Sequence, residues 1–272
     1  MHPKVSSLLN KLLTKFSSKQ KKVMPSYLIT GASRGIGLSI VEELLKQDDT
    51  FVIATARNIA GSSGLEALTA KFSKDRLALV PLDVSSQESI DAAVKATGDL
   101  LPKGLDNLIL NAGVHHQPLC SFDDIDFDKL ADELKFNTEY PIRTVRSFLP
   151  LIRAGEGKKI VFMTSELGSV EMAGILPGLT NAYSIAKAAF NMVARKYGGL
   201  LKFEGINVVA LHPGWVKTEI GSGIEGWMAT YAPQIKQMTP EESAAGCVKV
   251  IQAAKLEDAT SFWNDKGEKK PW

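Results

Sequence analysis

Short apolar runs alternate with amphipathic segments along most of the chain. The apolar runs expected to form strands are 27–30, 51–56, 76–82, 105–110, 159–164, 206–211 and 261–263. Between them, residues at helical spacing predict helices over 35–46, 65–72, 86–100, 126–152, 183–203 and 240–254. Strands that alternate with helices in this way favour a parallel sheet with helices on both faces.

The long helical pattern over 126–152 contains two interruptions, Asn137 and Pro141. Proline inside a helix removes a hydrogen bond and bends the helix, so we expect a kink at Pro141. Asn137 lies one turn before that kink. It is either tolerated by locally opened backbone or placed there for a purpose.

Three glycines, Gly31, Gly35 and Gly37, connect the first strand to the first helix. Glycine permits a tight turn and a close approach of a diphosphate, and the helix that follows offers free N–H groups to the phosphates. The Gly-x-x-x-Gly-x-Gly spacing matches neither the G-x-G-x-x-G fingerprint nor a P-loop. A turn that binds nothing is therefore the alternative to a nucleotide site.

The predicted architecture is an α/β fold: a single-domain, doubly wound parallel sheet of Rossmann type with about seven strands and helices on both faces. In such folds the residue about twenty positions after the glycine turn contacts the adenosine ribose, and an arginine there accommodates a 2′-phosphate. Arg57 occupies that place, and Arg34 lies inside the turn. The pattern favours NADP(H) over NAD(H), with two merely exposed arginines as the alternative.

Polar residues follow several strands at the edge where open α/β sheets bind ligands. Asp83 either accepts a hydrogen bond from an adenine amino group or caps the next helix, which Ser85 or Ser86 could also begin. Asn111 follows the fourth strand and Ser165 the fifth. We expect these side chains to meet at one edge of the sheet.

Tyr183 and Lys187 are four residues apart at the start of a helix, so their side chains share one helix face. The lysine ammonium, helped by the positive nicotinamide of an oxidised cofactor, is expected to lower the pKa of the phenol, which then exchanges a proton with a carbonyl oxygen. Ser165 would hydrogen-bond the same oxygen, and Asn137 could hold a water that links Lys187 to solvent. A buried tyrosine with no chemical role is the alternative.

These motifs together resemble the short-chain dehydrogenase/reductase family over residues 27–263. The resemblance implies a catalytic set of Asn137, Ser165, Tyr183 and Lys187. It implies that the cofactor is bound by Gly31, Ser33, Arg34, Gly35, Ile36, Gly37, Arg57, Asp83, Val84, Asn111, Ala112, Gly113, Tyr183, Lys187, Pro213, Gly214, Val216 and Thr218.

Within that family, the segments 181–196, 212–218 and 265–272 are similar to the branch of norsolorinic acid ketoreductase and the sniffer-type carbonyl reductases. The resemblance implies NADPH-dependent reduction of a ketone or aldehyde, and homodimers or homotetramers built on the helices around Asp126 and Tyr183. The gap between Ser165 and Tyr183 is longer than is usual in the family, so Ser169 stays open as the catalytic serine. His115 and His116, unusual at their place, are interpreted as loop residues because two adjacent histidines do not make a metal site.

Residues 219–240 have the composition of a mobile apolar flap. We expect Trp215, Trp227 and Tyr231 to line a pocket with Ser165 and Tyr183 for a hydrophobic or aromatic small-molecule carbonyl substrate, although they could merely pack the flap. A non-catalytic NADP(H)-sensing or scaffold protein is the alternative function, and the complete set of catalytic residues argues against it. A sugar-nucleotide epimerase would call for a larger region after the sixth strand.

Composition separates residues 1–23 from the domain predicted over 24–272. The 272-residue chain has a net charge of +2, but six lysines and no acidic residue lie in 1–23, so the rest is mildly acidic and does not indicate nucleic-acid binding. The basic amphipathic N-terminal extension could be a targeting peptide, a membrane-surface helix, a dimer arm or dispensable, and we expect membrane contact only if it is retained. Cys120 and Cys247 match no metal or redox spacing, which favours a reducing, cytoplasmic location.

Overall fold

A computed structural model describes residues 24–175 and 178–272. The described residues form one sheet of seven parallel strands in the order β3-β2-β1-β4-β5-β6-β7. The strands are β1 (Ser26–Ile29), β2 (Phe51–Ala56), β3 (Leu77–Pro81), β4 (Asn107–Leu110), β5 (Lys159–Met163), β6 (Asn207–His212) and β7 (Phe262–Asn264). The predicted fold class is confirmed. The expected N-terminal extension, residues 1–23, lies outside the described residues.

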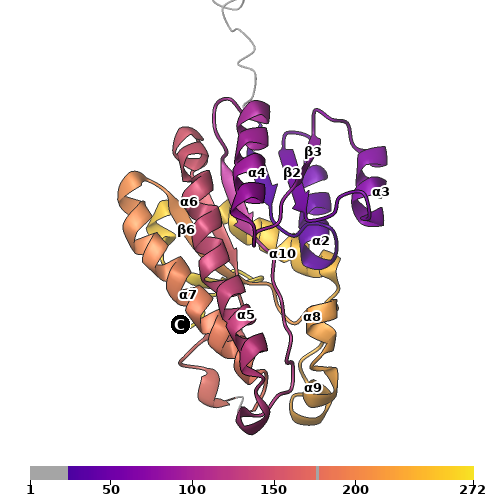
Figure 1. The fold of residues 1–272 in the computed structure, drawn as a ribbon, viewed down its shortest axis with the longest axis vertical. Helices are drawn as coiled ribbons and strands as arrows, with labels where there is room; N and C mark the ends of the chain where they lie inside the picture. The colour runs from indigo at the N-terminus through magenta and orange to yellow at the C-terminus, as the bar shows by residue number, and fades with distance from the viewer. Residues whose placement is uncertain (1–23, 176–177) are drawn as a thin grey trace, which may run out of the picture.

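Helices cover both faces of the sheet (Figure 1). The α-helices are α2 (Gly35–Leu45), α3 (Ser63–Lys71), α4 (Gln87–Leu100), α5 (Phe127–Asn137), α6 (Glu139–Ala154), α7 (Asn181–Leu201), α8 (Glu219–Ser222), α9 (Glu225–Tyr231) and α10 (Pro240–Ala253). Short 3₁₀ turns are η1 (Phe122–Asp124), η2 (Glu166–Gly168), η3 (Ala173–Ile175), η4 (Lys202–Glu204) and η5 (Leu256–Asp258).

Alternation along each strand divides the core into two layers. Leu28 and Ile53 point into a layer covered by α4, α6 and α7, whereas Ile29 and Ala54 point into a layer covered by α2, α3 and α10. All four side chains are fully buried. Because both faces of the sheet are covered, the strands read as continuous apolar runs, which is why their positions could be predicted.

The order of the strands reverses between β1 and β4. These two strands are neighbours in the sheet although they lie far apart in the sequence. At such a switch point the chain leaves the two strands in opposite directions and opens a crevice at their carboxyl ends. The glycine turn follows β1, and the segment that begins with Asn111 follows β4. The topology therefore brings two of the predicted site segments together.

The predicted kink at Pro141 is wrong. Helix α5 ends at Asn137, and Thr138, with φ −127° and ψ −69°, separates it from α6. Pro141 lies in the first turn of α6, where a backbone N–H has no partner in the helix, so its ring costs little. Pro150 is the proline inside the helix.

The segment predicted as an apolar flap contains α8 and α9. Ile224 and Met228 pack with Leu179, from the segment before α7, in a small apolar cluster. Trp215 packs against this cluster and donates a 2.9 Å hydrogen bond from Nε1 to the Gly221 carbonyl. Within the described part of the chain, no helix combines the length and apolar character needed to cross a membrane.

Candidate active site

The glycine turn has the backbone that the sequence predicts. Gly31 and Gly35 have φ angles of +67° and +57°, in the left-handed region that favours glycine. A side chain at Gly37 would collide with the Asn111 side-chain amide nitrogen and with the Gly31 carbonyl oxygen. The turn is therefore too closely packed to accept a side chain at Gly37. We call this turn, residues 31–37, the glycine cradle.

The helix that starts at this cradle keeps its first N–H groups free of side-chain caps. Arg34, in extended conformation, is the N-cap residue of α2 and makes no capping hydrogen bond, whereas Ser62 and Ser86 cap α3 and α4. Uncapped N–H groups at a helix N-terminus bind phosphate, so this cradle fits the diphosphate of a dinucleotide. Ile36, in the first turn, packs toward the core, and the carbonyl of Ser33 accepts a 2.9 Å hydrogen bond from Ser62.

The loop after β6 reaches the same cradle. Thr218 Cγ2 lies 3.3 Å from where a Cβ would sit on Gly35. Gly214 has a φ of +87°, and the carbonyl of Pro213 accepts a 2.7 Å hydrogen bond from Ser243. Val216 forms a β-bridge with Met238, which fixes this loop against the segment before α10.

The two predicted phosphate-binding arginines have different surroundings. Arg34 forms a 2.7 Å ion pair with Glu219 of α8, and both side chains are largely exposed. Arg57 is exposed after β2, and its charge acts on Asp83. The structure thus brings Arg57 to the carboxylate predicted to contact adenine.

Asp83 does not cap α4, because Ser86 is the N-cap residue and accepts from Ser89 N. Instead Asp83 Oδ1 accepts hydrogen bonds from Ser85 N at 2.9 Å and Ser85 Oγ at 2.7 Å. Burial alone would raise the pKa of Asp83, but these bonds and the charge of Arg57 outweigh it, so the pKa is lowered. Asp83 is an anion at neutral pH, and Val84 beside it faces a pocket.

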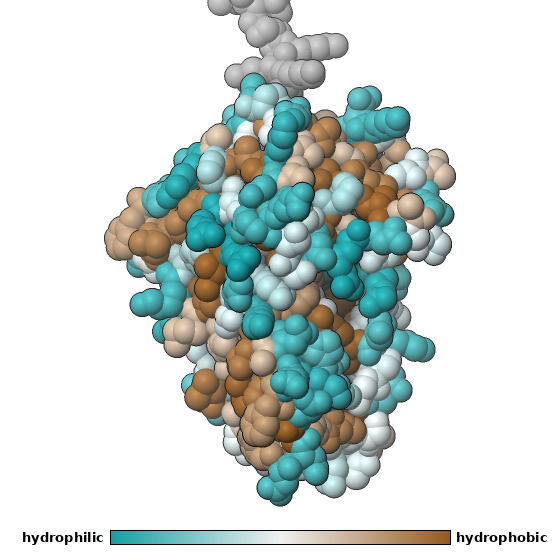
Figure 2. All heavy atoms as spheres, viewed as in Figure 1, coloured by the Kyte–Doolittle hydropathy of each residue, from teal (hydrophilic) through white to brown (hydrophobic). Residues whose placement is uncertain are grey.

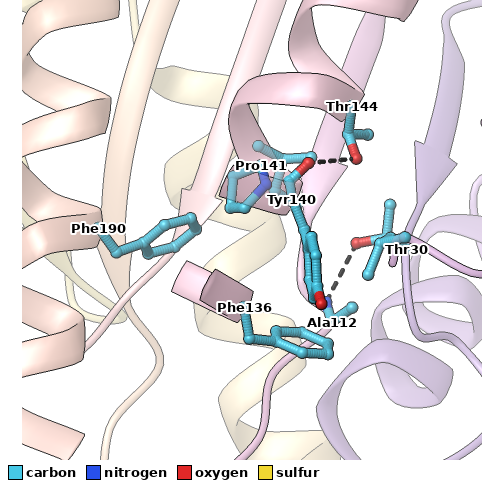
Figure 3. Close-up of a pocket in the computed structure, with 9 residues that line it drawn as sticks. Thr30, Ala112, Phe136, Tyr140, Pro141, Thr144 and Phe190 are labelled. Atoms are coloured by element: carbon cyan, nitrogen blue, oxygen red, sulfur yellow. Dashed lines mark hydrogen bonds between the residues drawn. The ribbon is translucent and has the colours of Figure 1, made fainter. Parts of the chain in front are cut away.

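That pocket lies behind the glycine turn, between the sheet and the junction of α5 and α6 (Figure 3). Tyr140 and Phe136 face Ala112 and Thr30 across it. Thr30 Oγ1 accepts hydrogen bonds from the N–H groups of Asn111 and Ala112, and the Asn111 amide donates to the carbonyls of Thr30 and Gly31. Asn111 therefore ties the segments after β1 and β4 together with its side chain.

Tyr183 and Lys187 lie on the buried face of α7, at 9% and 4% exposure. The helix begins two residues before Tyr183, after Thr180, whose φ of +54° turns the chain into it. Lys187 Nζ donates a 3.3 Å hydrogen bond to the carbonyl of Met163 and lies 5.6 Å from the centre of the Tyr183 ring. The two side chains are neighbours without a direct hydrogen bond.

Ser165 comes to this pair from the end of β5. It is 6% exposed, and its Oγ accepts a 3.1 Å hydrogen bond from Leu167 N at the start of η2. Gly168 packs directly on the backbone of Lys187, where a side chain would collide. Asn191 accepts from Thr164 Oγ1 and donates to the Gly168 carbonyl, so one side chain fastens the end of β5 to α7.

The other candidate, Ser169, lies beyond η2, 1% exposed, with its Oγ accepting from Met172 N at 3.2 Å. Ser165 lies two residues after the end of β5, whereas Ser169 lies beyond the 3₁₀ turn η2. The carboxyl edge of the sheet is where ligands bind in this architecture, which favours Ser165. Asn191, which fastens both segments to α7, was not anticipated from the sequence.

The pKa of Tyr183 moves opposite to the sequence-based expectation. Burial, and then the charge of Glu133, raise it above its ordinary value. Burial lowers the pKa of Lys187 to about 8, against a smaller opposite effect of Glu133. In the protein without cofactor, Tyr183 thus holds its proton firmly at neutral pH.

Glu133 is a site residue that sequence reasoning missed. It is fully buried on α5, one turn before Asn137, and its Oε1 accepts a 2.5 Å hydrogen bond from His116 N. Its Oε2 has no hydrogen-bond partner among the described residues. Asn137 is 2% exposed, and its side-chain amide donates a 2.8 Å hydrogen bond to the Glu133 backbone carbonyl. Its position four residues before Asn137, on the same face of the helix, was the sequence feature that could have pointed to Glu133.

His115 is also more than a loop residue. Its ring lies 4.4 Å from the Tyr183 ring, centre to centre, with the planes tilted by 40°. Among the described residues, no group of three or more His, Cys, Asp and Glu side chains could hold a metal ion.

The predicted substrate residues divide into two sets. Trp215 and Trp227 are partly buried against the apolar cluster of α9 and Leu179. Tyr231 packs on Trp227, with ring centres 4.9 Å apart, but is 68% exposed. The two tryptophans are therefore packed into the fold, whereas the tyrosine lies largely at the surface.

Comparison with known proteins gives consistent matches. A family model described as short chain dehydrogenase matches residues 26–229. An uncharacterized oxidoreductase of Schizosaccharomyces pombe is 34% identical over 89% of this chain and 95% of its own length. An NADPH-bound carbonyl reductase from chicken fatty liver has a TM-score of 0.80 at 32% identity, over 92% of this chain and 99% of that one. Carbonyl reductase Sniffer of D. melanogaster has a TM-score of 0.80 at 27% identity, over 92% and 100%.

Proposed function

Because the chain belongs to the short-chain dehydrogenase family, we propose that this oxidoreductase uses NADPH to reduce a ketone or aldehyde to an alcohol. The observation that supports the proposal is a buried phenol and a buried ammonium side by side on α7, packed against the segment after β5 that carries a buried hydroxyl. These groups are Tyr183, Lys187 and Ser165. A protein that only sensed the nucleotide would need none of them.

Each of these groups has one role in the proposal. Tyr183, which burial keeps protonated, donates its proton to the carbonyl oxygen. Ser165 hydrogen-bonds that oxygen and stabilises the charge that develops on it. Lys187 holds the ribose, and Asn137 at the end of α5 positions a water that replaces the proton. Bound NADPH would supply the hydride.

The preference for NADPH over NADH rests on charge near the adenosine end of the cleft. Arg34 at the N-cap of α2 and Arg57 after β2 are two exposed guanidinium groups available to a 2′-phosphate. The chicken carbonyl reductase that resembles this chain binds NADPH. An NAD-dependent enzyme would place an acidic residue where Arg57 stands.

The proposed substrate is hydrophobic, because apolar side chains surround the loop after β6. Trp215 and Trp227 pack with Leu179 and Met228 beside that loop. Such a wall favours an aromatic or aliphatic carbonyl compound over a sugar. We also propose a cytoplasmic location, on the ground that Cys120 and Cys247 are both free thiols.

The test is a panel of aldehydes and ketones, aromatic polyketide ketones included, with NADPH or NADH oxidation followed by absorbance at saturating cofactor. We expect turnover of apolar carbonyl compounds with NADPH, and a much higher KM for NADH. NADPH binding without oxidation across the panel would support the sensing or scaffold function instead. The Ser165→Ala and Ser169→Ala variants, run side by side, identify the catalytic serine as the one whose loss removes turnover.

A further inference from the structure

The stretch that follows Ser165, residues 166–171, contains the 3₁₀ turn η2 and is held by groups from other parts of the chain. The Glu166 N–H donates a 3.2 Å hydrogen bond to Nδ1 of His212, at the end of β6. Within the stretch, the Leu167 N–H donates a 3.1 Å hydrogen bond to the Ser165 hydroxyl oxygen. The place of that hydroxyl therefore depends on where residues 166–171 are held.

The last residues of the chain, 265–272, hold this stretch at both of its ends. We call them the C-terminal segment. Lys270 Nζ lies 3.1 Å from Glu166 Oε1, and the two side chains are only 22% and 24% exposed. Five residues further on, the Glu171 N–H donates a 3.0 Å hydrogen bond to the carbonyl oxygen of Trp272.

The C-terminal segment is itself fixed to the sheet and to α7. The Lys270 N–H donates a 2.7 Å hydrogen bond to the carbonyl of Phe262 in β7. The Trp272 ring lies 5.5 Å from the ring of the buried Phe262, centre to centre, and 5.0 Å from the guanidinium of Arg195 on α7. Figure 1 marks this end of the chain beside α7. The segment thus ties the stretch after Ser165 to the helix that carries Tyr183.

Two adjacent lysines of the C-terminal segment have different surroundings. Lys269 Nζ lies 3.8 Å from Asp258 in η5, and its side chain is 62% exposed, so solvent screens this pair. Lys270 and Glu166 are both mostly buried, where a charge that loses its partner is destabilised more strongly. The chain therefore offers its own control for the Lys270 pair.

We propose that Lys270 is a positioning residue for carbonyl reduction, because its ion pair with Glu166 fixes the stretch after β5 and thereby the Ser165 hydroxyl. The inference rests on the proposed function. The hydroxyl has to stand at hydrogen-bond distance from the carbonyl oxygen as charge develops there. A displacement of about 1 Å can cost on the order of 10²-fold in rate. Lys270 acts only through Glu166, so it affects kcat and not the binding of NADPH.

The experiment compares Lys270→Met, Lys270→Arg and the control Lys269→Met with the wild type. Methionine keeps most of the aliphatic side chain but removes the charge, and arginine restores a charge that can pair with Glu166. For each protein we measure kcat and KM for the best ketone of the panel, the Kd for NADPH and the temperature of unfolding. Hydrogen exchange of residues 166–171, followed by mass spectrometry, needs no turnover.

Lys270→Met should lower kcat about three- to tenfold with little change in the Kd for NADPH, since a hydroxyl held loosely is less often in place. Exchange of residues 166–171 should become faster. Lys270→Arg should restore both, and Lys269→Met should match the wild type. Glu166→Gln removes the same pair from its other side and should reproduce the effect of Lys270→Met, should that variant fold poorly.

A double variant separates positioning from general stability. In a Ser165→Ala background, Lys270→Met should cost much less in kcat, because the hydroxyl that it positions is gone. A full loss in that background, a loss that arginine does not restore, or equal losses in Lys270→Met and Lys269→Met would overturn the inference. If the wild type reduces no carbonyl compound, the proposed function fails, and hydrogen exchange alone decides whether Lys270 fixes the stretch: unchanged exchange refutes it.

Discussion

Tyr183 and Lys187 show at residue scale how burial sets the protonation state that a side chain keeps. Burial disfavours the charged form of each, so the pKa of Tyr183 rises while that of Lys187 falls to about 8. A phenol that keeps its proton is suited to donate it to a carbonyl. The reverse reaction needs the phenolate, which the protein alone does not favour.

Tyr183→Phe removes the proton donor and keeps the ring that packs on His115. We expect kcat/KM for carbonyl reduction to fall by about 10²- to 10⁴-fold, the usual contribution of a general acid. The Kd for NADPH, measured by fluorescence titration, should change little. Retained turnover would refute the assigned role of Tyr183.

Glu133→Gln tests the buried carboxylate whose charge acts on Tyr183 and Lys187. In the proposed mechanism the Lys187 ammonium is lost as pH rises through its pKa of about 8, which gives an alkaline limb, and the charge of Glu133 raises that pKa. Removing the charge should move the alkaline limb of the kcat/KM profile to lower pH, by roughly half a unit to one unit. Glutamine retains an oxygen that can accept from His116 N.

The control for this change is Asp132→Asn, on the same helix. Asp132 is paired with His116, and its side chain is 51% exposed, so solvent screens its charge. Its pH profile should coincide with that of the wild type. Equal shifts in both variants would show that the effect comes from general surface charge and not from Glu133.

At the scale of elements, the glycine cradle is a part of the fold that we expect to tolerate substitution poorly. Gly37→Ala should lower the free energy of unfolding by about 1–3 kcal/mol, because the new methyl group collides with Asn111 and the Gly31 carbonyl. It should also abolish NADPH binding. Thermal unfolding and fluorescence titration measure the two effects.

Gly199 on α7 gives a matched substitution. A Cβ there would meet no atom within 4 Å. Gly199→Ala should therefore stabilise the protein, by about 0.5–1 kcal/mol, because alanine loses less backbone entropy than glycine in a helix. Destabilisation by Gly199→Ala as large as that by Gly37→Ala would contradict the steric argument.

The ion pair between Arg34 and Glu219 joins the glycine turn to α8 across the cleft. Glu219 competes with a 2′-phosphate for the same guanidinium. Glu219→Gln should lower the Kd for NADPH about two- to fivefold at low salt, since exposed pairs are weak, and leave the Kd for NADH unchanged. Equal changes for both cofactors, measured by titration, would count against a 2′-phosphate at Arg34.

The sequence predicted elements better than it predicted their interruptions. Strands buried on both faces are continuous apolar runs, so all seven were placed within a few residues. The break between α5 and α6 falls at Thr138, a residue with no turn signature, while Pro141 fits the first turn of a helix as well as a kink. Only the packed positions of the two helices separate these possibilities.

At the scale of the whole molecule, the site residues predicted from sequence are those that follow strands or share one helix face. Glu133 and His115 could not be predicted, because their roles depend on contacts between α5, the segment after β4, α7 and α8. The pKa of Tyr183 was expected to fall through Lys187 and a bound oxidised nicotinamide together, but in the protein alone it rises. Spacing places Lys187 nearby, but burial by the whole fold outweighs one charge.

Apolar side chains also gather on the outer surface, where brown patches interrupt the hydrophilic cover in Figure 2. On the outer face of α7, Ile185 and Met192 lie two turns apart and are 40% and 60% exposed, and Phe127 at the start of α5 is 77% exposed. Helices α5 and α7 pack side by side. We propose that this apolar face is the contact between copies in the homodimer or homotetramer that the family resemblance implies.

Met192→Asp should therefore convert the assembly to smaller species, because a charge buried without a partner in an apolar interface is costly. Sedimentation velocity at micromolar concentration measures the change. Leu100→Asp is the control, since Leu100 is 44% exposed at the end of α4, away from this face. A monomeric wild type, or dissociation by Leu100→Asp and not by Met192→Asp, would place the interface elsewhere. Retained carbonyl reduction in the dissociated variant would further show that one subunit contains the complete site.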